Sequence, residues 1–138
     1  MNNRHAWGNL LLRLLLGFMF TFVGASKLFM GKMPVEPIGA ILNALGLNTF
    51  SAATFGLILG IIELVIGLMF ILGLFTQVAA WIATVALLLF VIGAGLILGD
   101  GLLGQMMMFK DIGLIGASLC LAFQGSPSMS LDHLLWKK

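Results

Sequence analysis

The chain is poor in the residues that build disulfides and metal sites. Its 138 residues include one cysteine, two histidines and no tyrosine. The single cysteine, Cys120, excludes an internal disulfide and a thiolate cluster, and in its apolar run a packing thiol is the usual case. His5 and His133 lie outside the long apolar runs, so they do not predict a haem held by two histidines inside a membrane. We therefore expect no metal site.

Charged residues are scarce as well. Asp, Glu, Lys and Arg make up 9% of the chain and hydrophobic residues 61%, with a mean hydropathy of +1.16. A soluble domain is about a quarter charged, so this composition predicts an integral membrane protein, with residues 1–138 as a single domain. The formal charge of +2 is small and scattered, which argues against a nucleic-acid partner and leaves the lipid bilayer as the expected environment.

Four apolar stretches are long enough to cross about 30 Å of hydrocarbon as helices. They cover about residues 7–29, 53–74, 77–98 and 106–123. We expect an all-α membrane protein with four transmembrane helices in an antiparallel bundle. Arg13 interrupts the first stretch, which favours a retained helix over a cleaved signal peptide. Pro34 and Pro37 are expected to break any helix in the first connection, with a short interfacial helix at residues 38–47.

Basic residues near the ends of these stretches predict the orientation. Arg4, Lys137 and Lys138 share one side of the bilayer, and Lys32 lies on the other. Because basic residues favour the cytoplasmic side, we expect both termini to be cytoplasmic.

Small residues recur at helical spacing in the first two stretches. Gly17 and Gly24 share a face of the first stretch, and Gly56, Gly60 and Gly67 share a face of the second. Because stripes of small residues let transmembrane helices approach closely, we expect these glycines to pack helices together.

Arg13 and Glu63 lie deep within the first two stretches. A carboxylate inside a membrane is expected to find a partner in the bundle. At 1.5 Å per residue from the inner ends, Arg13 is about 9 Å deep and Glu63 about 16 Å deep, and Lys27 is close to the outer end. An extended arginine covers most of that difference. We therefore expect a buried Arg13–Glu63 pair, direct or through water. Its role would be either to exchange a proton or contact a quinone, or to hold the helices in register.

More polar residues gather near the predicted outer end. One interpretation is that they extend to the lipid headgroups as membrane-end lysines commonly do. The other is a polar mouth that accepts a headgroup, a quinone ring or a soluble partner. No catalytic residue is evident from the pattern. The residues of this outer cluster are Lys27, Asp100, Lys110 and Asp111, with Lys32 and Glu36 nearby.

Three stretches, LLRLLLGFMFTFVGASKLF, IIELVIGLMFILGLFTQVAA and FKDIGLIGASLCLAFQGSPSMSLD, together resemble the DoxX family of small bacterial and archaeal membrane proteins. One departure is that this chain reads GSPSMSLD where the family often has GPGRLSLD, so that arginine is missing. The matching positions are Arg13, Gly17, Phe20, Gly24, Lys27, Glu63, Gly67, Gly73, Thr76, Ala80, Lys110, Asp111, Gly125, Ser130, Leu131 and Asp132.

The resemblance implies a prokaryotic cell membrane and a link to quinones and membrane oxidoreductases. Three functions stay open. The first is an accessory or quinone-interacting subunit of an oxidoreductase complex, with other membrane or redox subunits or further copies as partners and quinone as the candidate cofactor; Glu63 could accept a proton from a quinol hydroxyl. The second is a structural or assembly protein without chemistry. The third is a small transporter, since charges inside spans often mark transport paths.

Overall fold

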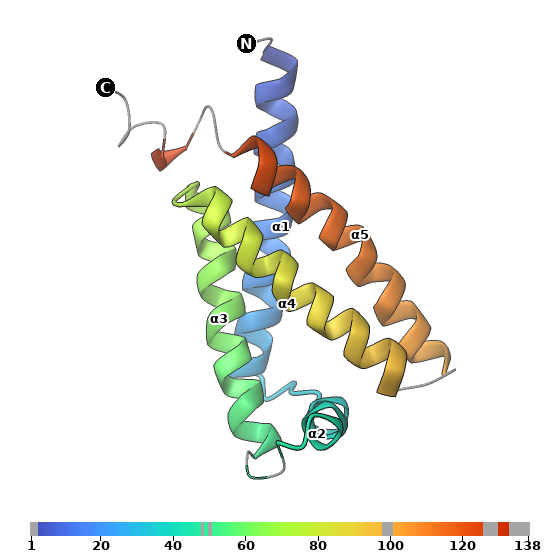
Figure 1. Cartoon of the computed structure of the whole chain (residues 1–138). Coiled ribbons are helices and arrows are strands. Elements are labelled where there is room, and N and C mark those ends of the chain that lie inside the picture. Colours follow the sequence, from blue (N-terminus) through green and yellow to red (C-terminus); the bar gives the residue numbers. More distant parts are fainter. Residues whose placement is uncertain (1–2, 48, 50, 98–100, 126–129, 133–138) are drawn as a thin grey trace.

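The described part of the chain is entirely helical. The computed structural model describes residues 3–47, 49, 51–97, 101–125 and 130–132, and these contain five helices and no strand. The four long helices begin and end within about one turn of the predicted apolar stretches. In chain order the helices are α1 (Asn3–Phe29), α2 (Val35–Ala44), α3 (Ala52–Leu72), α4 (Thr76–Ile97) and α5 (Leu102–Gln124) (Figure 1).

Three of the described helices are long and apolar enough to cross a membrane. The spans are His5–Phe29, Ala52–Leu72 and Gly104–Gln124, whereas the apolar part of α4 recognised in this way is the shorter Thr76–Ile92. Large apolar side chains cover the outward faces, as at Leu15 and Phe18, which are each 68% exposed. Such a surface suits lipid rather than water. The prediction of an all-α membrane protein is confirmed, and the fourth span stays a prediction.

α1 and α3 form an antiparallel pair whose backbones are in contact (Figure 1). A Cβ added at Gly17 would lie 2.9 Å from the Gly67 carbonyl oxygen, and one added at Gly24 would lie 2.7 Å from the Gly60 carbonyl oxygen. Because the atoms in the way are backbone, only glycine allows this helix spacing. We call Gly17, Gly24, Gly60 and Gly67 the glycine seam.

α4 and α5 form a second antiparallel pair (Figure 1). Ala79, Ala80 and Ala83 of α4 are fully buried, and their small side chains let neighbouring helices approach. The hydroxyls of Thr84 and Ser118 share a hydrogen bond of 2.8 Å between the two helices. Such bonds contribute about 0.6 kcal/mol on average in a membrane protein, so packing holds the pair together more than polar contacts do.

The two helix pairs meet at one end of the molecule and separate at the other (Figure 1). At the closed end the start of α1 lies beside the end of α5, where the Asn9 side-chain amide donates to the Gly125 carbonyl oxygen at 2.9 Å. Buried side chains such as Leu16, Phe70 and Leu121 fill the space between the pairs. At the open end α4 and α5 lean away from α1 and α3, and α2 lies there.

α2 covers the open end and is amphipathic, as the sequence predicts for this connection. Ile38 and Leu42 are each 2% exposed. Before the helix, Met33 packs on Gly56, where an added Cβ would lie 2.6 Å from the Met33 sulfur. The prediction that Pro37 breaks the helix is wrong. It lies in the first turn of α2, where a backbone N–H has no partner within the helix to lose.

A polar latch, formed by Arg13, Gly73 and Asp132, holds the closed end together. The Asp132 carboxylate accepts hydrogen bonds from the backbone N–H groups of Phe75 at 2.7 Å and Thr76 at 3.0 Å, where α4 begins. The Asp132 N–H donates to the Gly73 carbonyl oxygen at 3.0 Å. Gly73 has a φ of 67°, and a Cβ there would lie 2.8 Å from the Arg13 Cζ. The latch therefore joins α1, the α3–α4 turn and the C-terminal segment.

Removing the Asp132 carboxylate is expected to weaken the closed end. Its two hydrogen bonds cap the N-terminus of α4, and loss of such a cap costs about 1–2 kcal/mol. We expect Asp132→Ala to lower the melting temperature of the detergent-solubilised protein, and Asp132→Asn, which keeps one acceptor oxygen, to lower it less. An alanine variant as stable as the wild-type chain would show that the cap contributes nothing.

Candidate functional site

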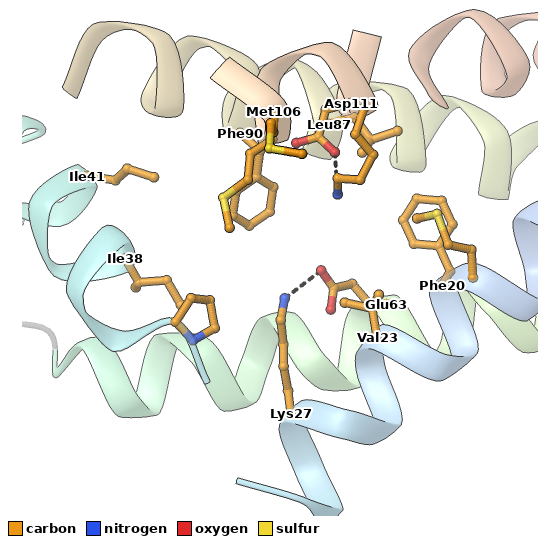
Figure 2. A pocket seen from close by; sticks show the side chains of 14 residues that line it. Phe20, Val23, Lys27, Ile38, Ile41, Glu63, Leu87, Phe90, Met106 and Asp111 are labelled. Carbon is orange, nitrogen blue, oxygen red and sulfur yellow. Dashed lines mark hydrogen bonds and ion pairs between the residues drawn. The ribbon is translucent and has the colours of Figure 1, made fainter. Parts of the chain in front are cut away.

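A cavity of about 520 Å³ lies between the two helix pairs at the open end. Residues from all five helices line it, and α2 forms one of its walls (Figure 2). The walls are mostly apolar, and four charged side chains stand among them. The apolar residues include Phe20, Val23, Ile38, Leu87 and Phe90, and the charged ones are Lys27, Glu63, Lys110 and Asp111.

Lys27 and Glu63 form a buried ion pair across the α1–α3 contact. Lys27 Nζ lies 2.6 Å from Glu63 Oε1, and the two side chains are 7% and 13% exposed. The ammonium also lies 5.6 Å from the centre of the Phe90 ring, within the range of a cation–π contact. Glu63 Oε2 is buried without a hydrogen-bond partner in the described part of the chain. The pair thus keeps capacity to accept a further hydrogen bond.

The predicted Arg13–Glu63 pair is wrong. Glu63 is paired with Lys27, and the Arg13 guanidinium lies beside Gly73 in the polar latch. Gly73 is ten residues further along the chain than Glu63, which corresponds to about 15 Å of helix. Arg13 is buried, as expected for a charge that faces the bundle, but it serves the closed end and not the cavity.

The helix register explains why the partner differs. The prediction placed both helices by depth from assumed membrane edges, whereas the glycine seam fixes how they align. A Cβ at Gly24 would lie 2.5 Å from the Leu64 backbone nitrogen and 2.7 Å from the Gly60 carbonyl oxygen, so Gly24 faces the turn of α3 that carries Glu63. Lys27 follows Gly24 by one turn on the same face and therefore reaches the carboxylate.

Asp111 stands on the wall opposite Lys27 and Glu63 (Figure 2), and its neighbour Lys110 also lines the cavity. Lys110 Nζ lies 2.7 Å from Asp111 Oδ1, and the side chains are 56% and 9% exposed. The two groups are within ion-pair distance, but the contact lacks the geometry of a hydrogen bond. The structure thus brings three of the predicted outer cluster, Lys27, Lys110 and Asp111, around one cavity, and Asp100 lies outside the described residues.

The cavity combines apolar walls with two ammonium groups and two carboxylates. Ammonium groups only donate hydrogen bonds and carboxylates only accept them. The four formal charges cancel, so the arrangement suits an uncharged ligand with an apolar body and polar ends. Among the described residues, no group of three or more His, Cys, Asp and Glu side chains could hold a metal ion.

Several lining residues escaped the sequence analysis. Phe90 and Ile38 belong to apolar patterns in which a ligand contact and a core contact look alike. The Lys27–Glu63 pairing did leave a signal, because the seam glycines are seven residues apart on both helices. Aligning these two equal spacings in antiparallel order places Glu63 closer to Lys27 than to Arg13. Lys32 and Glu36 are exposed and do not line the cavity.

A comparison with known proteins identifies the family. A family model described as DoxX matches residues 8–100, a range that begins within α1, runs to the end of α4 and includes Lys27 and Glu63. The resembling stretch that begins at Phe109 lies beyond that range. No curated protein and no solved structure matches the chain. The match covers more than half of the chain, so this multi-pass helical membrane protein belongs to the DoxX family.

Proposed function

We propose that this chain binds a quinone-class ring in its cavity and acts as a membrane subunit of a quinone-linked oxidoreductase complex. The observation that carries the proposal is that two ion pairs, Lys27–Glu63 and Lys110–Asp111, line one apolar cavity, with Glu63 and Asp111 on opposite walls (Figure 2). A quinone is an apolar ring with an oxygen at each end. An ammonium group on either wall can donate a hydrogen bond to one of those oxygens.

The size and lining of the cavity support a ring ligand. Its volume of about 520 Å³ falls within the range of about 300–1,000 Å³ that is usual for small-molecule sites. Phe20 and Phe90 stand on different walls and offer aromatic faces (Figure 2). Contacts between aromatic rings add about 0.5–1.5 kcal/mol beyond the area they bury.

The proposed role is that of an accessory subunit. The described residues of the cavity supply binding groups and carboxylates, and Glu63 is the group that we propose to accept a proton from a quinol hydroxyl. We assign the group that carries electrons to a partner subunit.

Native mass spectrometry of the gently solubilised protein tests both the quinone site and the partner, because we expect a bound quinone and a redox partner in the spectrum. Finding neither would contradict the proposal.

Narrowing the cavity should weaken quinone binding. Leu87 lines the cavity and is 6% exposed, whereas its neighbour Leu88 is 43% exposed and does not line it. We expect Leu87→Phe to raise the dissociation constant of a short-chain quinone at least about tenfold, equivalent to about 1.4 kcal/mol. Leu88→Phe is the matched control and should bind as the wild-type chain does. Equal binding by both variants would mean that the ligand sits elsewhere.

We further propose that α1, α3, α4 and α5 all cross a prokaryotic plasma membrane, with both termini cytoplasmic. α4 has 22 residues and is therefore about 33 Å long, enough for a hydrocarbon core of about 30 Å. The start of α1 and the end of α5 lie at the same end of the molecule, which supports placing both termini on one side (Figure 1).

A structural or assembly role is the second candidate. The observation that favours it is that Lys27 and Glu63 already satisfy each other's charge within the chain. In that case the pair only fixes helix register. A Lys27→Met/Glu63→Leu double variant would then still restore the abundance of a partner complex in a deletion strain, whereas a ligand-binding subunit carrying it would not restore quinone-dependent activity.

A further inference from the structure

The two ion pairs also bear on which chemical form of a ring ligand the cavity holds. Each pair presents an ammonium donor and a carboxylate acceptor side by side, Lys27 with Glu63 and Lys110 with Asp111. A hydroxyl group both donates and accepts a hydrogen bond, whereas a carbonyl oxygen only accepts. A hydroxyl can therefore use both members of such a pair, and a carbonyl can use only the ammonium.

The carboxylates have acceptor capacity left over. Glu63 engages Lys27 through Oε1, and its Oε2 has no hydrogen-bond partner among the described residues. Asp111 Oδ1 is close to Lys110 Nζ but lacks a well-aligned hydrogen bond. A buried acceptor left unsatisfied is unfavourable. A ligand that brings a donor to Glu63 Oε2 removes the deficit on that wall, and a ligand with acceptors alone leaves it in place.

The charge balance of the cavity points the same way. Two ammonium groups face two carboxylates, so the lining carries no net formal charge. A phosphate or another anionic headgroup would bring an uncompensated charge between these walls, which is costly in a low-dielectric site. An uncharged ring with a polar group at each end leaves the balance intact.

We propose that the cavity prefers the reduced, dihydroxy form of its ligand, an uncharged aromatic ring with a hydroxyl at each end, over the dicarbonyl form. One hydroxyl lies at Lys27–Glu63 and donates to the Glu63 carboxylate. The other lies at Lys110–Asp111 and donates to the Asp111 carboxylate. This inference rests on the proposed function, because it specifies the form of the ligand that the same site binds.

Three related probes test the preference. The protein in phosphatidylcholine nanodiscs is equilibrated with a decyl-substituted benzoquinol, with its quinone, and with the quinol dimethyl ether, and bound ligand is counted after subtracting empty nanodiscs. The dimethyl ether keeps the ring and the oxygens but lacks donors. We expect the quinol to bind about tenfold to a hundredfold more tightly than either of the other probes.

The outcomes separate the inference from the function on which it rests. Equal binding of all three probes, or tighter binding of the quinone, overturns the preference and leaves the quinone-class site standing. No binding above empty nanodiscs overturns both.

Charge-removing variants locate the acceptors. We expect Glu63→Gln to reduce the preference for quinol over dimethyl ether about tenfold, since an amide replaces the charged acceptor with a weaker one and adds a donor. Asp111→Asn, on the other wall, should also reduce the preference for quinol over dimethyl ether. It is the variant to measure if Glu63→Gln folds poorly. Glu36→Gln is the matched control, because Glu36 is exposed on α2 and does not line the cavity. An unchanged preference in both cavity variants overturns the assignment.

Discussion

Lys27→Met is expected to lower the free energy of unfolding by about 3–5 kcal/mol, as measured by denaturation in mixed detergent micelles. Lys27 Nζ lies 2.6 Å from Glu63 Oε1, and both side chains are largely buried. Methionine keeps much of the length and apolar stem of lysine but removes its charge. Glu63 would then be left as a buried charge without its ion-pair partner, which is the costly state.

A double-mutant cycle separates the pairing from the loss of packing. We expect Lys27→Met/Glu63→Leu to be more stable than Lys27→Met alone, because replacing both charges with apolar groups removes the unpaired charge. The corresponding cycle of Arg13→Met with Glu63→Leu should be additive within about 0.5 kcal/mol, since these residues lie far apart. Coupling of Glu63 to Arg13 and not to Lys27 would contradict the register described above.

Gly24→Ala is expected to cost about 3 kcal/mol or more, although it adds a single methyl group. The new Cβ would lie 2.5 Å from the Leu64 nitrogen and 2.7 Å from the Gly60 carbonyl oxygen. Both are backbone atoms, so no side chain can rotate out of the way and the two helices must move apart. Folded yield and unfolding in mixed micelles would measure the loss.

α5 offers a matched control for the same chemical change. Gly113 lies within α5, and a Cβ there would meet nothing within 4 Å. We expect Gly113→Ala to leave stability unchanged or raise it by up to about 1 kcal/mol, because alanine favours a helix more than glycine does. If Gly24→Ala and Gly113→Ala behaved alike, close backbone contact along the glycine seam would be refuted.

The helices could be predicted because hydrophobicity and length report directly on insertion into a membrane. The apolar runs predicted α1, α3, α4 and α5 to within about one turn. Pro37 was misread because a proline has opposite consequences in the first turn and in the interior of a helix. The sequence alone does not state where a short helix begins.

The site was harder to predict because it depends on register and on the angle between helices. Depth along an assumed membrane normal paired Arg13 with Glu63, while backbone contacts between glycines pair Lys27 with it. The cavity itself arises where the α4–α5 pair leans away from α1 and α3 (Figure 1). No local pattern encodes that angle, and so the apolar lining residues could not be told from core residues.

The polar latch has a mechanical consequence. Asp132 and Gly73 hold α4 at its first residue, while the cavity lining at Phe90 lies fourteen residues further along, about 21 Å from that point. α4 is thus held at its N-terminal end, so a change in its tilt there moves its far end the most. A tilt of about 5° at Thr76 displaces Phe90 by about 2 Å, which is more than half the length of a hydrogen bond. A small adjustment at the latch is therefore magnified at the cavity, where it changes the distance between the Phe90 ring and the Lys27 ammonium group.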